Sequence, residues 1–209
     1  MERYFRALYD ERRRKPGDDL MSSLIQEQAE GKLSAEEVCS QCMLLLIAGH
    51  VTTIDQLSNA VYTLLTHPDQ LRKLSADPAL IKGAIEEILR FDGAVSFTHR
   101  VAAADLEIGG KAVRKGEVVY LGLAAANRDP EAFADPEVFD ITRPVARHIA
   151  FGAGPHVCIG AGLTRRELEI GLLTLFRRKP GLRLIDEDPP RRRCESLVFR
   201  GFHTLPVAC

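Results

Sequence analysis

The chain has 209 residues, a formal net charge of −1 and 45% hydrophobic residues. This length allows one domain with a hydrophobic core, and the balanced charge gives no basic face for a nucleic acid. The longest apolar run, residues 43–48, is too short to span a membrane. The 5 cysteines are an odd number without disulfide-like spacing, which suits a reducing compartment. We therefore expect a cytoplasmic protein that binds neither nucleic acid nor a membrane.

Apolar periodicity, together with proline and glycine stop signals, predicts a mainly helical chain. The expected helices cover residues 3–14, 20–30, 34–67, 68–75, 78–91 and 161–176. Ser34 and Glu37 have the spacing of a capping box, which marks the start of the longest helix. Because this helix carries the apolar run at residues 43–48, we expect it to cross the core of the domain.

The middle of this long helix contains residues that interrupt helices. Gly49 lowers helix stability, and the hydroxyls of Thr52 and Thr53 compete for backbone hydrogen bonds. One interpretation is a harmless kink. The other is a small-molecule pocket against the helix face, to which Thr52 offers its hydroxyl. The pattern alone leaves both open.

Two further pairs on predicted helices have ordinary interpretations. Cys39 and Cys42 form a lone C-x-x-C pair, for which helix packing is favoured over a zinc or redox site. Glu87 and Arg90 are three residues apart, so they lie on one helix face and can form an ion pair. Taken alone, such a pair is usually a surface feature of little energetic weight.

The chain after Gly93 changes to short strands and turns. Strands are expected at residues 96–101, 106–113 as a hairpin around Gly109 and Gly110, 117–123, 182–185 and 197–205. Residues 127–150 are rich in turns and lack periodicity, and a loop of this length is usually functional. The sequence contains no repeat and no low-complexity linker, so we expect one domain, residues 1–209, mainly α with small β sheets.

The stretch from Phe151 to Gly160 is the strongest candidate for a functional site. It places Cys158 just before the predicted helix 161–176, where free N–H groups and the helix dipole favour a thiolate. Gly152, Gly154 and Gly160 allow tight turns and a close approach to a bulky group. Such a thiolate is a nucleophile or a metal ligand; the alternative is a buried structural cysteine.

Several of these features, in this order, resemble the cytochrome P-450 family, the heme-thiolate monooxygenases, in its soluble bacterial form. The stretch Phe151–Gly160 is similar to the family's heme-binding loop, a highly specific motif. Glu87 and Arg90 are similar to its buried ion-pair motif, whose partner is then Arg143. Residues 48–53 are similar to the oxygen-binding groove of the long central helix. The resemblance extends over essentially the whole chain.

The resemblance implies a cofactor site for heme (iron protoporphyrin IX). Cys158 is then the axial iron ligand, and a thiolate ligand favours cleavage of the O–O bond. The residues implied in binding the cofactor are Arg100, Phe151, Gly152, His156 and Gly160. Phe151 shields the thiolate, the loop glycines bring N–H groups to the sulfur, and Arg100 and His156 pair with the heme propionates.

The resemblance also implies catalytic roles for three residues of the long helix. Ala48 and Gly49 leave room for dioxygen, and Thr52 supplies a hydroxyl that helps a proton reach the oxygen. The family usually has an acid just before this threonine, but this chain has Val51, which cannot carry a proton. Proton delivery then depends on water, on Thr52, on His50 or on the substrate, and we expect slower turnover or more peroxide release than in acid-bearing relatives.

The function that follows from the resemblance is a heme-dependent monooxygenase. It inserts one oxygen atom from dioxygen into a small, mostly apolar organic substrate, using electrons from a ferredoxin-type donor. The chain corresponds to the C-terminal portion of the family fold, including the long central helix and the cysteine-loop helix, and is about half the usual length. We therefore expect the N-terminal half to be lacking. The alternatives are a fragment of a longer enzyme, peroxide-driven oxidation without an electron donor, and a non-catalytic heme-binding or interaction protein that docks onto a partner or a second copy.

Overall fold

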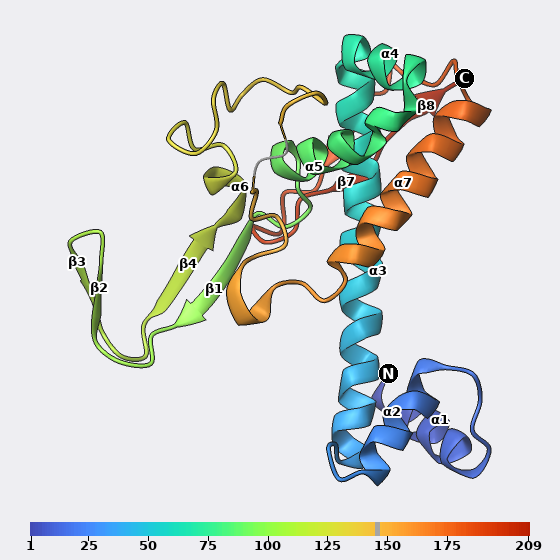
Figure 1. Cartoon of the computed structure of the whole chain (residues 1–209), viewed down its shortest axis with the longest axis vertical. Coiled ribbons are helices and arrows are strands. Elements are labelled where there is room, and N and C mark those ends of the chain that lie inside the picture. The colour runs from blue at the N-terminus through green and yellow to red at the C-terminus, as the bar shows by residue number, and fades with distance from the viewer. Residues whose placement is uncertain (145–146) are drawn as a thin grey trace. The chain divides into compact units, whose positions relative to one another are not determined.

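The computed structural model describes residues 1–144 and 147–209 and is mainly helical with small two-stranded sheets, as expected (Figure 1). The helices are α1 (Glu2–Arg14), α2 (Leu20–Ala29), α3 (Ala35–Thr66), α4 (Pro68–Ala76), α5 (Ile81–Phe91), α6 (Leu123–Ala126) and α7 (Ala161–Arg178). The strands are β1 (Phe97–Val101), β2 (Leu106–Ile108), β3 (Lys111–Val113), β4 (Val118–Gly122), β5 (Arg183–Leu184), β6 (Arg191–Arg192), β7 (Phe202–Thr204) and β8 (Val207–Ala208). The chain divides into two compact units, Met1–Val51 and Thr52–Cys209.

The first unit packs α1 and α2 against the beginning of α3. Its buried apolar residues are Phe5, Tyr9, Met21, Val38, Cys39 and Cys42. The predicted capping box is confirmed, because the Ser34 N–H donates to Glu37 Oε2 (2.7 Å) and the Glu37 N–H donates to Ser34 Oγ (3.2 Å). Burial raises the pKa of the Cys39 and Cys42 thiols. Ordinary helix packing of this cysteine pair is therefore confirmed, and the described residues contain no group of His, Cys, Asp or Glu that could hold a metal ion.

The long helix α3 continues without a break from Ala35 to Thr66. The predicted single helix over residues 34–67 is therefore confirmed, and Gly49, Thr52 and Thr53 do not end it. A single glycine inside a helix costs about 1 kcal/mol. Cooperative hydrogen bonding along the helix on both sides outweighs that local cost.

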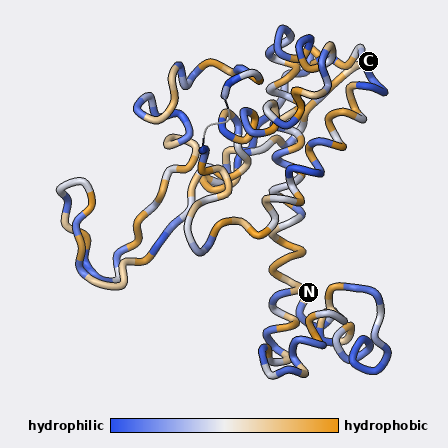
Figure 2. The backbone as a smooth tube through the Cα atoms, in the orientation of Figure 1, coloured by the Kyte–Doolittle hydropathy of each residue, from blue (hydrophilic) through white to orange (hydrophobic). Residues whose placement is uncertain are grey.

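The apolar run in α3 is not buried, so the expectation that it crosses the core is wrong. Leu44, Leu46 and Ile47 have exposed fractions of 58%, 52% and 55%, and Figure 2 shows the hydrophobic colouring along this part of the helix. The first unit covers only the face of α3 that carries Val38 and Cys42, four residues apart. A second set of deeply buried positions lies later in α3: Asp55, Gln56, Asn59, Ala60, Thr63 and Leu64.

In the part of the chain that the structure describes, α3 is the one helix with the length and composition of a membrane span. Its most apolar window has a mean hydropathy of 1.4 and is 17% buried. From the short apolar run at residues 43–48, the sequence had predicted no helix with the composition of a membrane span. A core helix of a water-soluble protein has the same length and composition, so this finding does not distinguish the two.

The second unit has its core between the later part of α3 and helices α4, α5 and α7. The buried apolar residues are Ala60, Leu64, Leu74, Ile81, Ala84, Ile85, Ile88, Leu89, Phe139, Ile141, Leu168 and Leu172. Helices α3 and α7 pack closely, since a Cβ atom on Gly171 would lie 3.1 Å from Leu57 Cδ2. Figure 1 shows α7 running beside this part of α3. This packing places the loop before α7 next to the core.

The short strands match expectation in part. Strands β5 and β7 lie within the expected ranges 182–185 and 197–205 but are shorter, and β6 and β8 were not expected. Strands β1 and β4 pair antiparallel, and β2 and β3 form the predicted hairpin, in which Gly109 and Gly110 have φ angles of 56° and 76°. The strand expected to end at residue 123 ends at Gly122, because α6 begins at Leu123. The turn-rich stretch 127–150 contains no helix or strand in its described part, and residues 145–146 lie outside the described residues.

Candidate functional site

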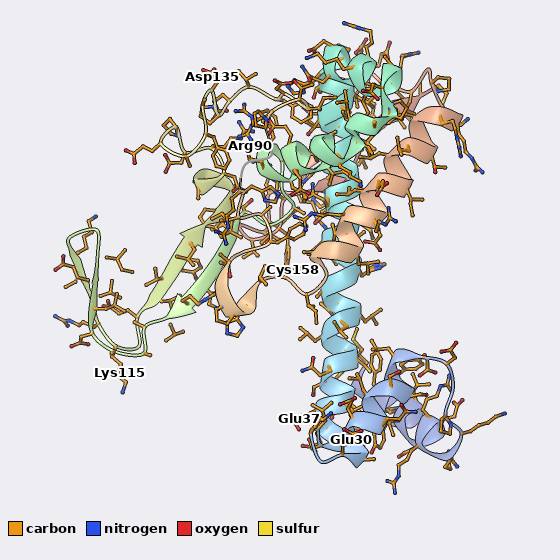
Figure 3. The ribbon with its side chains drawn as sticks, viewed as in Figure 1. Glu30, Glu37, Arg90, Lys115, Asp135 and Cys158 are labelled. Carbon is orange, nitrogen blue, oxygen red and sulfur yellow. The ribbon has the colours of Figure 1, made fainter. Side chains whose placement is uncertain are left out.

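The cysteine loop is closed by backbone hydrogen bonds and leads directly into α7 (Figure 3). The Cys158 N–H donates to the Phe151 carbonyl oxygen at 2.9 Å, and the Val157 N–H donates to the Gly154 carbonyl oxygen at 3.1 Å. Gly152 and Gly154 have φ angles of 71° and 78°, which are strained for residues with a Cβ atom. These glycines therefore allow the chain to turn back and bring the Cys158 amide to Phe151.

The thiol of Cys158 is exposed, so the alternative of a buried structural cysteine is wrong. The apolar side chains that surround it in sequence are also exposed, by 54% for Val157, 90% for Ile159 and 64% for Leu163. A Cβ atom on Gly160 would lie 3.7 Å from the Cys158 sulfur, so the glycine leaves that side of the sulfur uncovered. An accessible soft sulfur among exposed apolar groups suits a bulky apolar group that carries a metal ion.

Arg100 on β1 and His156 in the cysteine loop are both exposed. The Arg100 guanidinium donates to Thr98 Oγ1 (3.3 Å) and to the His99 carbonyl oxygen (2.8 Å), and no carboxylate among the described residues pairs with it. The structure likewise shows no carboxylate partner for His156 within its described ranges. Both side chains are therefore available to pair with carboxylates of a bound group.

The three residues assigned to oxygen chemistry all lie on α3. Ala48 and Gly49 belong to the first unit, whereas Thr52 begins the second. Their grouping around the cysteine loop stays a prediction. Within the second unit, Thr53 Oγ1 donates to Glu167 Oε2 at 3.3 Å, which ties α3 to α7. No local pattern indicates this contact, because Glu167 lies 114 residues from Thr53 in the sequence.

The ion pair of Glu87 and Arg90 is buried, so the alternative of a weak surface pair is wrong. The two side chains are 3% and 2% exposed, and two hydrogen bonds of 2.7 Å join them. Arg143 Nε donates to Glu87 Oε1 at 3.2 Å, which confirms the expected third member. The Arg90 guanidinium also donates to the carbonyl oxygens of Asn127, Pro136 and Val138. This cluster fixes the turn-rich stretch to α5.

A second acidic cluster, centred on Glu86, lies beside the cysteine loop and was not recognised in the sequence. Arg165 donates two hydrogen bonds to the Glu86 carboxylate, of 2.6 and 2.9 Å. His148 Nε2 lies 3.0 Å from Glu86 Oε2. Burial alone would raise the pKa of Glu86, but the hydrogen bonds from Arg165 and His148 outweigh it and lower the pKa to about 2.

This low pKa predicts a stability contribution that depends on pH. The folded value of about 2 lies below the ordinary 4.5, so the contribution is fully present above the ordinary value and is lost as the pH falls toward 2. Near neutral pH, we expect the free energy of unfolding of the wild-type chain to exceed that of Glu86→Gln by up to about 3 kcal/mol. Urea unfolding should show this difference shrinking between about pH 5 and pH 3. A difference that does not change with pH would contradict the prediction.

Comparison with known proteins identifies the family. A family model described as Cytochrome P450 matches residues 1–79 and 76–179. The chain belongs to the cytochrome P450 family. The expected fold class, a C-terminal portion of the P450 fold with its long central helix and cysteine-loop helix, is confirmed. Members of this family bind heme, iron protoporphyrin IX.

Similar P450 proteins come from several bacteria. The chain is 47% identical to the biotin biosynthesis cytochrome P450 of Bacillus subtilis, over 98% of this chain and 51% of that protein. It is 44% identical to 6-deoxyerythronolide B hydroxylase of Saccharopolyspora erythraea, over 96% of this chain and 50% of that protein. The chain thus spans about half the length of these P450 relatives.

Solved P450 structures resemble this chain closely. P450BioI, in complex with an acyl carrier protein ligated to hexadec-9Z-enoic acid, matches with a TM-score of 0.93 and 47% identity, over 99% of this chain and 52% of that one. CYP109E1 from Bacillus megaterium, in complex with testosterone, matches with a TM-score of 0.94 and 38% identity, over 99% of this chain and 54% of that one.

Proposed function

We propose that this chain holds heme through the Cys158 thiolate and takes part in monooxygenation. The reaction inserts one oxygen atom from dioxygen into a small, mostly apolar organic substrate. The observation that carries the proposal is the exposed Cys158 thiol, in a glycine-rich loop that its own backbone hydrogen bonds close. Membership of the P450 family, whose matched relatives include a hydroxylase, supports the same reaction class.

The residues of the cysteine loop bind and orient the cofactor in this proposal. Bound heme supplies a redox-active iron that activates dioxygen, and thiolate ligation favours cleavage of the O–O bond. Cys158 provides the sulfur, and the hydrogen bond from its N–H to Phe151 fixes the direction of its backbone. The Phe151 ring shields the thiolate from water, and the glycines Gly152 and Gly160 keep the backbone close to the sulfur. Arg100 and His156 neutralise the propionates.

Ala48, Gly49 and Thr52 of α3 would serve dioxygen binding, as the family resemblance implies. Ala48 and Gly49 leave space because they have the smallest side chains. The Thr52 hydroxyl holds a proton in hydrogen-bonding reach of the reacting oxygen. Val51 cannot take part in proton transfer, so water, Thr52, His50 or a group of the substrate has to supply the proton.

The partners and the location follow from the same reaction class. Two electrons are needed for each oxygen atom inserted, and we propose a ferredoxin-type protein as their donor. A cytoplasmic location agrees with the bacterial relatives and with the free cysteines of the described chain. The relatives' names span biotin biosynthesis and hydroxylation of 6-deoxyerythronolide B, so they support an organic substrate without selecting one.

The cofactor proposal is tested by the spectrum of the reduced protein with carbon monoxide. We expect the chain, purified and supplied with heme, to show the red-shifted Soret band of thiolate-ligated heme. Cys158→Ser should lose this band completely, because a serine hydroxyl does not ligate as a thiolate. Cys194→Ser, which changes another exposed cysteine, should keep it. Failure to take up heme, or an unchanged band in Cys158→Ser, would contradict the proposal.

A second candidate function is a non-catalytic heme-binding or interaction protein. It is favoured by the exposed apolar side chains of Leu44, Leu46 and Ile47 on α3, which can bind a second copy of the chain. Analytical ultracentrifugation distinguishes the candidates. Stable self-association that replacement of these three residues by serine abolishes, in a chain without a thiolate-type heme spectrum, would favour the interaction protein.

A further inference from the structure

We propose that Arg165 is a positioning residue that holds the Cys158 loop in the geometry needed to ligate iron. The inference deepens the proposed function and rests on it for the role of Cys158. Within the second unit, Arg165 on α7 contacts both the Glu86 carboxylate on α5 and the Phe151 ring of the cysteine loop.

Arg165 is fixed in direction by a two-pronged ion pair. Its Nε and Nη2 atoms donate to the two oxygens of Glu86, at 2.6 and 2.9 Å. Its Nη1 atom donates to the Ala161 carbonyl oxygen at 3.3 Å, in the first turn of α7. A bidentate arginine–carboxylate pair restricts the plane of the guanidinium more than a single contact does. The guanidinium is therefore held as a rigid surface at the start of α7.

The Phe151 ring packs on this surface. The guanidinium carbon of Arg165 lies 4.8 Å from the centre of the ring, which is within the range of a cation–π contact. The carbonyl oxygen of Phe151 accepts the hydrogen bond from the Cys158 N–H. A continuous path of contacts thus runs from Glu86 through Arg165 and Phe151 to the backbone of the proposed iron ligand.

His148 supports the same carboxylate from the other side. Its side chain is 4% exposed, and its Nδ1 atom accepts a hydrogen bond from the Ala150 N–H at 3.2 Å. With Nδ1 as the acceptor, Nε2 faces Glu86 Oε2 at 3.0 Å as the hydrogen-bond donor. The His148 ring also lies 6.2 Å from the Phe151 ring. Glu86 accordingly joins α5 to α7 through Arg165, and α5 to the segment before the loop through His148.

The neighbouring arginine provides a matched control. Arg166 has a side chain that is 69% exposed and pairs with Glu169 on the same helix. Among the described residues it makes no hydrogen bond or ion pair with Glu86 and no cation–π contact with Phe151. Replacing Arg166 by glutamine removes the same charge from the same helix turn without touching the path to Cys158.

The first readout does not depend on heme. Amide hydrogen exchange is measured in the heme-free chain for wild type, Arg165→Gln, Arg165→Lys and Arg166→Gln. In Arg165→Gln we expect residues 151–158 to exchange at least roughly tenfold faster, because hydrogen bonds to a charged group are lost. The exchange rate in Arg165→Lys should lie between those of wild type and Arg165→Gln. Lysine keeps the positive charge but cannot form the bidentate pair with a carboxylate. Arg166→Gln should match wild type.

The second readout is the carbon monoxide spectrum of the reduced, heme-supplied chain. Arg165→Gln should show a smaller fraction of the thiolate-type Soret band and bind heme roughly tenfold more weakly, as is common when a residue that orients a ligand is lost. Equal loop exchange in the Arg165 and Arg166 variants would overturn the inference. If Arg165→Gln accelerated hydrogen exchange equally in the buried part of α3, the inference would also be overturned, because such a result indicates general destabilisation. Faster loop exchange, confined to the loop, in a chain that binds no heme would support the loop contacts and refute the proposed cofactor.

Discussion

Replacing Glu87 with alanine should lower the free energy of unfolding by about 3–5 kcal/mol, a large part of the stability of a typical domain. The substitution leaves Arg90, which is 2% exposed, without its carboxylate partner. It also removes the acceptor for Arg143 Nε and for the Asp140 N–H. The cost arises mainly from the uncompensated buried charge, because water cannot solvate Arg90 at that position.

Urea unfolding followed by circular dichroism measures this effect. Glu107→Ala is the control, since Glu107 is an exposed carboxylate on β2; its unfolding free energy should change by less than about 0.5 kcal/mol. The double variant Glu87→Ala with Arg90→Met should recover part of the loss, because it removes the unpaired charge. A loss below about 1 kcal/mol for Glu87→Ala would show that the buried pair carries little weight.

Replacing Asp92 with alanine should have the second-largest effect, a loss of about 2–3 kcal/mol. Asp92 is 4% exposed and lies between two arginines: Arg192 Nη2 at 2.6 Å and Arg200 Nε at 2.8 Å. The contact with Arg200 is a charge contact without well-aligned hydrogen-bond geometry. Both arginines are partly exposed, at 28% and 43%, so water can solvate them after the substitution. The loss is therefore smaller than for Glu87.

The location of the loss also tests the role of Asp92. Arg192 lies on β6 and stacks 4.3 Å from the centre of the Phe202 ring on β7. Loss of Asp92 should therefore accelerate hydrogen exchange in these two strands more than in α5. Asp188→Ala, which changes an exposed aspartate before β6, should leave the exchange unchanged. Uniform acceleration through the second unit would contradict a specific link to the C-terminal strands.

The regular elements could be predicted because their signals are local. The capping box of Ser34 and Glu37 marks the start of α3, and the glycine pair Gly109 and Gly110 marks the β2–β3 turn. Each signal involves residues a few positions apart in the sequence. It therefore specifies local structure without any tertiary contact. The elements that were not predicted are α6, a helix of 4 residues that follows β4 directly and has no start signal of its own, and the two-residue strands β6 and β8.

The sequence by itself determined the family and the residues of the cysteine loop. The loop motif is contiguous, and its glycines allow backbone turns within the same ten residues. Only the tertiary structure decided what supports the loop. Glu86 meets Arg165 across 79 positions of sequence and His148 across 62, and Asp92 meets Arg192 across 100. The exposure of the apolar run in α3 also could not be predicted from the sequence. Hydropathy describes a side chain, but it does not say whether another part of the chain packs against it. Folding brings these distant residues together, and no local pattern specifies which carboxylate pairs with which arginine.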